Sequence, residues 1–265
     1  MEVFKKGIEP ADVCQGRLGD CYFLSVISAL AEEPGRIESL FNTQEVNAAG
    51  IYSLNFFLNG KRQEVFVDDF VPCDRQSLLP CFAYSEQCGE IWAILLEKAW
   101  AKLHGSYCMV RSGSSVSTFP HLCGAPSSQF DHNYQEDLEK FWAILKDASE
   151  RKYSIASSTY DTDVNQSGPK DAKRGIVSGH SYSVLSCHQF KHQGEKVKLL
   201  KLRNPHGNYE WKGDWSDECP KWTTKLRKDL GSVNCNTDGL FFIPFADFVQ
   251  NFRCTSICYM TTTDR

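Results

Sequence analysis

Four residues of the types that thiol catalysis requires lie far apart in this sequence. Cys21 directly precedes the apolar run "YFLSVISAL", His180 precedes "SYSVL", and Asn204 is followed by a proline. A thiolate is the reactive form of cysteine, an imidazole can take up and return its proton, and an amide oxygen can orient the imidazole. Gln15, six positions before the cysteine, carries an amide that can donate to a developing oxyanion. The pattern predicts a nucleophile, an acid-base residue, an orienting residue and an oxyanion donor, in the order Cys21, His180, Asn204 and Gln15.

The residues around Cys21 predict that it opens a helix. Gly19 and Asp20 interrupt the preceding chain, and aspartate is a favoured capping residue at a helix N-terminus. We therefore expect Asp20 to cap a helix over residues 21–31 and Cys21 to lie in its first turn. Backbone N–H groups point outward there and lower the pKa of a thiol.

Periodicity along the chain predicts helices first and strands later. Apolar residues recur at helical spacing over 89–105 and 134–150, and residues 50–72 form two alternating runs joined by "NG", which is typical of a β-hairpin. The second half contains runs typical of strands at 179–190, 196–205, 239–244 and 253–262, with a short helix at 245–252. We therefore expect an α+β fold of two lobes, residues 1–124 and 125–265, with the changeover near "HLCGAPSSQ".

The composition excludes several classes of protein. The chain has 265 residues, 42% of them hydrophobic, and a formal net charge of -4 without long runs of one sign. Nothing in this balance favours nucleic acid or a membrane surface as a partner. No apolar leader and no membrane span is present in the sequence as written, and the twelve cysteines contain no CxxC pair. We expect free thiols and a cytoplasmic location.

The sequence resembles the calpain protease core over its whole length. The segments "QGRLGDCYFL", "GHSYSV" and "RNPHGNYEWKGDWSD" are similar to the three active-site segments of that family, and "GEIWAILLEKAWAKLHGSY" resembles the helix between them. The resemblance implies a papain-like cysteine endopeptidase with a helical lobe carrying Cys21 and a β-rich lobe carrying the histidine and asparagine. It implies limited cuts in protein or peptide substrates, and further regulatory domains in a longer chain. It also implies that Gly113 and Gly179 line the substrate cleft, with His206 beside it.

The resemblance further implies that each lobe binds calcium through oxygen ligands, without an organic cofactor. The first site carries over to Gly7, Asp12 and Glu90, and the second to Glu210, Asp217 and Asp238. These carboxylates are hard ligands of the kind that calcium prefers.

Three positions depart from the family pattern. Leu240 stands where the family has an acidic residue of the second site, and Pro10 stands where the family has an arginine that can pair with that acid. Because both ends of one contact between the lobes are missing, calcium is expected at the first site rather than the second, and the lobes are expected to close with little or no calcium. His206 stands where the family has a tryptophan, which predicts different gating of the cleft.

Other interpretations of the same residues remain open. Taken singly, Cys21 and His180 are typical of buried core residues, Asn204 before proline is a common turn residue, and the acidic residues are typical of caps or solvated turns. A catalytically silent module that binds partners is one alternative function. A transglutaminase-like acyl transferase is another, although that class resembles a triad with aspartate in the third place.

Overall fold

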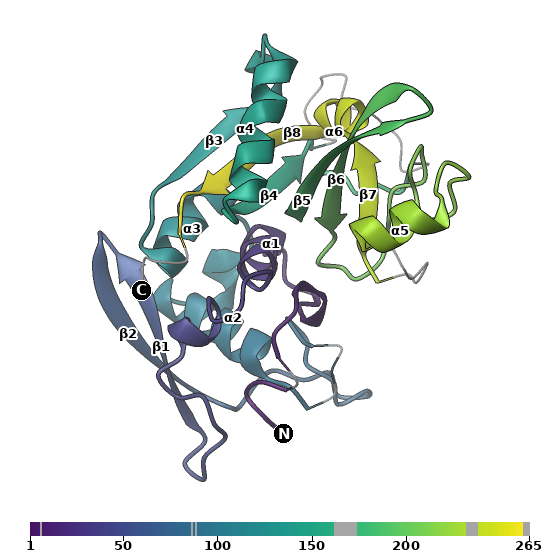
Figure 1. The fold of residues 1–265 in the computed structure, drawn as a ribbon. Coiled ribbons are helices and arrows are strands. Elements are labelled where there is room, and N and C mark those ends of the chain that lie inside the picture. Colours follow the sequence, from purple (N-terminus) through teal and green to yellow (C-terminus); the bar gives the residue numbers. More distant parts are fainter. Residues whose placement is uncertain (6, 86, 88, 162–173, 232–237, 262–265) are drawn as a thin grey trace.

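The computed structural model describes residues 1–265 except 6, 86, 88, 162–173, 232–237 and 262–265 (Figure 1). The helices are α1 (Cys21–Leu30), α2 (Trp92–Leu103), α3 (Ser115–Cys123), α4 (Leu138–Glu150), α5 (Thr224–Leu230) and α6 (Phe245–Asn251). The strands are β1 (Ile51–Leu58), β2 (Lys61–Asp68), β3 (Ser127–Asp131), β4 (Ser154–Thr159), β5 (Ser181–His192), β6 (Glu195–Arg203), β7 (Leu240–Pro244) and β8 (Phe252–Cys258). Short 3-10 helices are η1 (Pro10–Asp12), η2 (Glu38–Leu40), η3 (Tyr107–Val110) and η4 (His132–Tyr134).

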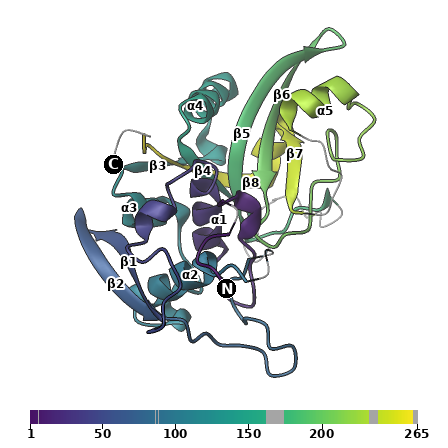
Figure 2. The same ribbon diagram turned by 60° about the horizontal axis from the view of Figure 1, so that its bottom comes forward.

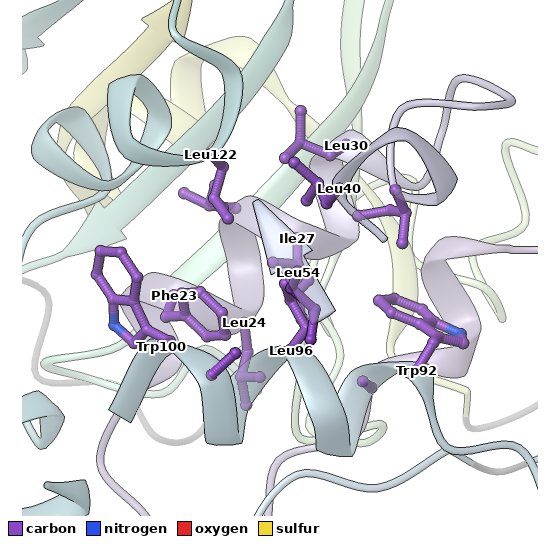
Figure 3. Packing of buried hydrophobic residues seen from close by; sticks show 14 of the residues in the cluster. Phe23, Leu24, Ile27, Leu30, Leu40, Leu54, Trp92, Leu96, Trp100 and Leu122 are labelled. Carbon is purple, nitrogen blue, oxygen red and sulfur yellow. The ribbon is translucent and has the colours of Figure 1, made fainter. Parts of the chain in front are cut away.

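Helix α1 lies in the middle of the molecule, between α2 and the large sheet (Figure 1). Every residue of α1 after Cys21 is buried, as expected for a helix that is apolar on all sides. On one side Phe23 stacks on Trp100 of α2, with ring centroids 5.0 Å apart and an interplanar angle of 14° (Figure 3). The rigid packing of α1 fixes the position of its first residue, Cys21.

The second half is built on a six-stranded sheet in the order β3-β8-β4-β5-β6-β7, with all the neighbouring pairs antiparallel. Strands β1 and β2 form a separate hairpin, with Leu58 opposite Lys61 across the "NG" turn. In the rotated view, β5 and β6 run as a long curved pair beside α1 (Figure 2). His180 directly precedes β5, and Asn204 directly follows β6.

Most of the predicted elements are confirmed. The hairpin, the helices corresponding to α1, α2, α4 and α6, and the strands corresponding to β5, β6, β7 and β8 all form. Residues of α3, α5, β3 and β4 were not predicted as regular structure. The helix α3 contains Pro120, and β4 reads "SIASST", in which serine replaces the apolar residues that identify a buried strand.

The buried apolar residues form separate clusters, and the lobes meet through α1. One large cluster consists mainly of residues 3–125, and a second is drawn from residues 141–257. The mixed helix and sheet architecture agrees with the α+β prediction, while the boundary between residues 124 and 125 stays a prediction. Ser25 of α1 and Ser181 of β5 join their hydroxyl groups at 2.8 Å, so a buried polar contact links the two halves.

Candidate active site

Cys21 is the first residue of α1 and remains partly exposed, as predicted. Burial raises the pKa of its thiol, while the backbone N–H of Ser181 lowers it and a charge on Asp20 raises it. The thiol therefore lies where a strand of the second lobe and the helix N-terminus both present backbone N–H groups. These groups favour the thiolate against the cost of burial.

The prediction that the Asp20 side chain caps α1 is wrong. Asp20 occupies the N-cap position, but its carboxyl group makes no capping hydrogen bond and is fully buried. Burial raises its pKa, and it lies against the carboxyl group of Glu97 in α2, whose pKa is also raised by burial and then by Asp20. No donor in the described part of the chain reaches either oxygen of Asp20. The contact between the two acids is therefore a hydrogen bond only when one of them holds a proton.

His180 and Asn204 are brought together as the sequence predicts. The Nε2–H of His180 donates to Asn204 Oδ1 at 2.8 Å, and both side chains are buried. Asn204 Nδ2 in turn donates to the carbonyl oxygens of Asn208 at 2.6 Å and Tyr209 at 3.1 Å. These bonds fix the direction of the amide and leave the Nδ1 of His180 as the ring nitrogen for the thiol.

The ring of His206 stacks on the ring of His180. Their centroids are 4.1 Å apart and the interplanar angle is 19°. Burial lowers the pKa of His180 to about 3, the His206 ring adds to this effect, and the hydrogen bond with Asn204 opposes it. Burial also lowers the pKa of His206. His180 is therefore neutral at pH 7 unless a negative charge such as the Cys21 thiolate faces it.

The described residues contain no hydrogen bond between the Cys21 thiol and the His180 ring. The link between them is Ser181, which follows His180 and turns its backbone N–H to the thiol. Its hydroxyl group meets those of Ser25 at 2.8 Å and Ser115 at 3.2 Å. This network holds the start of β5, and with it the residue that follows His180, against α1.

Gln15 is joined to the segment that follows Asn204. Its Nε2 donates to Leu18 O at 2.7 Å, which orients the amide and leaves its second N–H group. Its backbone N–H donates to Pro205 O at 2.8 Å, directly after Asn204. The side-chain oxygen is buried and has no hydrogen-bond partner in the described residues. The role of Gln15 as oxyanion donor stays a prediction.

The two glycines predicted to line the cleft are both exposed. A Cβ atom at Gly113 would meet ring atoms of Tyr22 at 2.5 Å, next to Cys21 in the chain. Gly179 has a φ of +60° and precedes His180. Each position therefore requires glycine for a structural reason, by close approach in one case and by a left-handed backbone in the other. Their contact with substrate stays a prediction.

The carboxylates of the first calcium prediction lie close together but already accept hydrogen bonds. A charge on Asp12 contributes to the raised pKa of Glu90, after the larger effect of burial. Asp12 accepts from the side chain of Gln87 at 2.9 Å, and Glu90 from a backbone N–H and a serine hydroxyl. Gly7, the third residue of this predicted site, is exposed.

The carboxylates of the second prediction also influence one another. Burial raises the pKa of Asp217 to about 6, and the charges of Glu210 and Asp238 add to this effect. Glu210 accepts from the backbone N–H groups of Asp238 at 2.9 Å and Gly239 at 2.8 Å. Among the described residues, no group of three or more His, Cys, Asp or Glu side chains is arranged to hold a metal ion. Both calcium assignments stay predictions.

Two features of the site were missed in the sequence. Arg203 is fully buried and donates from Nη1 to Val13 O at 2.6 Å and from Nη2 to Ala11 O at 2.8 Å. It thereby connects the strand that carries Asn204 to the segment before Gln15. Ser25 follows Cys21 by four residues and faces the same way, a helical spacing that would have indicated it. An arginine at the end of an apolar strand gave no comparable signal.

The comparisons with known proteins all indicate the same family. The family model described as "Calpain family cysteine protease" matches residues 1–259. "Calpain-type cysteine protease DEK1" of Arabidopsis thaliana is 36% identical over 263 residues, which cover 97% of this chain and 12% of that protein. "Calpain-9" of Rattus norvegicus is 33% identical over 261 residues, 96% of this chain and 37% of that protein. "Calpain-2 catalytic subunit" of the same species is 32% identical over 263 residues, 96% of this chain and 36% of that protein.

The chain thus spans between 12% and 37% of the length of these relatives. Within the described residues, no helix is long and apolar enough to cross a membrane.

Proposed function

The chain belongs to the calpain family of cysteine proteases, and we propose that it is a cysteine endopeptidase that cuts protein substrates at a few extended sites. The observation that carries this proposal is the 2.8 Å hydrogen bond between His180 Nε2 and Asn204 Oδ1, opposite a helix that begins at Cys21. A buried amide that fixes one ring nitrogen leaves the other to exchange a proton with a thiol.

Each residue then has one task in peptide cleavage. The Cys21 thiol gives its proton to His180 Nδ1, and the sulfur attacks the carbonyl carbon of the substrate. Gln15 Nε2 and the backbone N–H of Cys21 donate to the oxyanion. As the C–N bond breaks, His180 Nδ1 returns the proton to the leaving amine, and water then hydrolyses the thioester with His180 as base. Asn204 holds the ring in one orientation throughout.

The surroundings of the site favour an extended peptide as substrate. Gly113 and Gly179 are both exposed and have no side chain to hold a peptide backbone away, so we infer that an extended peptide can lie against them. The short lengths of chain that can reach such a site are those without a fold of their own, so we infer limited cuts in flexible segments of proteins.

Regulation and location are part of the same proposal. Because the relatives are much longer, we infer that regulatory domains accompany this core. Calcium would act through Asp12 and Glu90, or through the acidic group around Asp217, where mutual repulsion of carboxylates would be relieved by a cation. All ten described cysteines are free thiols, which supports a reducing, cytoplasmic location.

The test combines labelling and cleavage. The protein is treated with iodoacetamide in calcium or a chelator, the labelled cysteines are mapped by mass spectrometry, and casein cleavage is followed in parallel. We expect Cys21 to react faster than Cys73 and Cys108, which are more exposed but lie outside the site. Cys21→Ser should fold normally and lose cleavage, and Cys108→Ser, the matched control, should keep it.

Two other outcomes would each indicate a different function for this chain. Equal labelling of Cys21 and the exposed cysteines, without cleavage, would favour a silent module that binds partners. Selective labelling with incorporation of amines into glutamine side chains, and no peptide cleavage, would indicate an acyl transferase.

A further inference from the structure

The side chain of His206 is fixed on the face of the acid-base imidazole. Its ring lies 4.1 Å from that of His180, nearly parallel to it. Its backbone N–H donates to Asn204 Oδ1 at 3.0 Å, and this oxygen is the one that accepts from His180. The position of the ring is therefore set by the same amide that orients the catalytic histidine.

Two imidazoles at this distance influence each other's protonation. A proton on either ring makes it a cation, and like charges about 4 Å apart repel strongly even where the effective dielectric constant is near 20. The ring of His206 already contributes to the lowered pKa of His180, after the larger effect of burial. Only one of the two rings can therefore carry a proton easily.

The remaining neighbours of His206 do not compensate such a charge. Tyr209 meets its ring edge to face at 6.4 Å, and Tyr182 packs similarly against His180 at 5.0 Å. No carboxylate forms an ion pair with His206 in the described part of the chain. His206 is half-buried and His180 almost fully buried, so His206 takes up a proton from solvent more readily as the pH falls.

We propose that His206 is a positioning residue that also switches the acid step: when its ring is protonated, it holds His180 neutral. This inference rests on the proposed function of the same site. In acylation the S–C bond forms, the C–N bond breaks, and the proton of His180 Nδ1 passes to the leaving amine. With the charge on His206, His180 does not hold the thiol proton, which passes to solvent. The leaving amine then receives no proton, and the tetrahedral adduct returns to substrate instead of losing the amine.

Two substitutions separate charge from shape. His206→Phe keeps an aromatic ring without a titratable group, and His206→Arg places a planar cation on His180 at every pH. His188→Phe is the matched control, since His188 is also partly buried in the second lobe but its ring contacts Ser186 and Phe242. The measurements are kcat/KM for a peptide amide and the rate of iodoacetamide labelling at Cys21, both from pH 5 to 8.5.

The expected results differ between the variants. For His206→Phe, the ratio of kcat/KM at pH 5.5 to that at pH 7.5 should be higher than in the wild type, by up to roughly tenfold. For His206→Arg, amide cleavage should fall roughly a hundredfold or more at neutral pH, while labelling of Cys21 persists because a nearby cation stabilises a thiolate. His188→Phe should keep the wild-type profile.

Superimposable pH profiles of the wild type and His206→Phe would overturn the inference, as would full cleavage by His206→Arg. Nuclear magnetic resonance of the histidine rings keeps this test separate from the proposed function. In the catalytically inert Cys21→Ser protein, the ring of His180 should titrate differently when His206 is replaced by phenylalanine. If no form of the protein cleaves peptides, the proposed function fails, and an unchanged titration of His180 would independently reject the coupling.

Discussion

Replacing Glu97 by glutamine is expected to stabilise the protein, although Glu97 is buried against Asp20, the residue before Cys21. Burial and then Asp20 raise the pKa of Glu97, and Asp20 has a raised pKa as well, so the pair retains a proton at neutral pH. In the unfolded chain a glutamic acid has a pKa of about 4.3, and holding its proton at pH 7 costs about 1.36 kcal/mol per pH unit, or roughly 4 kcal/mol. A glutamine side chain is uncharged at every pH, so it avoids the cost of holding a proton.

The sign of the pH dependence follows from the raised pKa. A group whose folded pKa lies above its unfolded value contributes stability that is fully present below the unfolded pKa, and this stability is lost as the pH rises toward the folded value. Glu97→Gln removes this loss. The amide oxygen can still accept from the backbone N–H of Ala83, which reaches both Glu97 oxygens at 3.0 and 3.1 Å, and its N–H₂ group can donate to Asp20. We expect a gain of about 1–3 kcal/mol at pH 8, less than the full proton cost because the new amide packs imperfectly.

The assay is urea unfolding of both proteins at several pH values between 5 and 8. The difference in the free energy of unfolding should grow in favour of Glu97→Gln by up to about 1.4 kcal/mol per pH unit. Glu139→Gln is the control, because Glu139 is exposed and Lys198 lowers its pKa, so its replacement should not stabilise the protein at high pH. A difference that stays constant from pH 5 to 8 would refute the reasoning. If Glu97→Gln fails to fold, Asp20→Asn addresses the same proton.

Three further predictions concern the cleft. Arg203→Met removes two buried hydrogen bonds to Val13 O and Ala11 O, and thermal unfolding should show a loss of about 2–4 kcal/mol together with a fall in cleavage. Gly113→Ala should lower kcat and reduce the free energy of unfolding by about 1–3 kcal/mol, because the new Cβ would meet Tyr22 at 2.5 Å. In the control Gly60→Ala, in the hairpin turn, the new Cβ would have nothing within 4 Å, and kcat should be unchanged. Casein cleavage in a chelator should stay within about threefold of that in millimolar calcium, because the lobes already meet through Ser25 and Ser181, and strict dependence on calcium would contradict this.

The sequence predicted the placement of the candidate catalytic residues better than the structure that surrounds them. Cys21, His180 and Asn204 could be found because catalysis demands particular residue types, and each lies at the boundary of an element with clear periodicity. The helix N-terminus at Cys21 was correctly predicted. The side chain of Asp20 was not, since its partner Glu97 lies on another helix, and a single sequence holds no sign of that pairing.

The elements missed by the sequence share a physical reason. Strand β4 is a central strand rich in serine, and its hydroxyl groups are satisfied by neighbours that only the tertiary fold supplies, such as Thr255 for Ser157 at 2.7 Å. Local periodicity reports apolar burial and not buried polar contacts. The same limit hid the contact of Ser181 with α1, which proved to be the link between the lobes.

A second connection between the lobes lies near Pro10 and Leu240, where the sequence predicts that a contact of the family is missing. Arg203 lies opposite Leu240 in the pairing of β6 with β7, so the lost acid and the buried arginine belong to neighbouring strands. Its guanidinium group binds the two carbonyl oxygens that flank Asp12 in the chain. These two bonds join the strand carrying Asn204 to the segment leading to Gln15 through backbone carbonyl acceptors. Because these two acceptors carry no charge, their contribution to the link should depend less on ionic strength than an ion pair between side chains would.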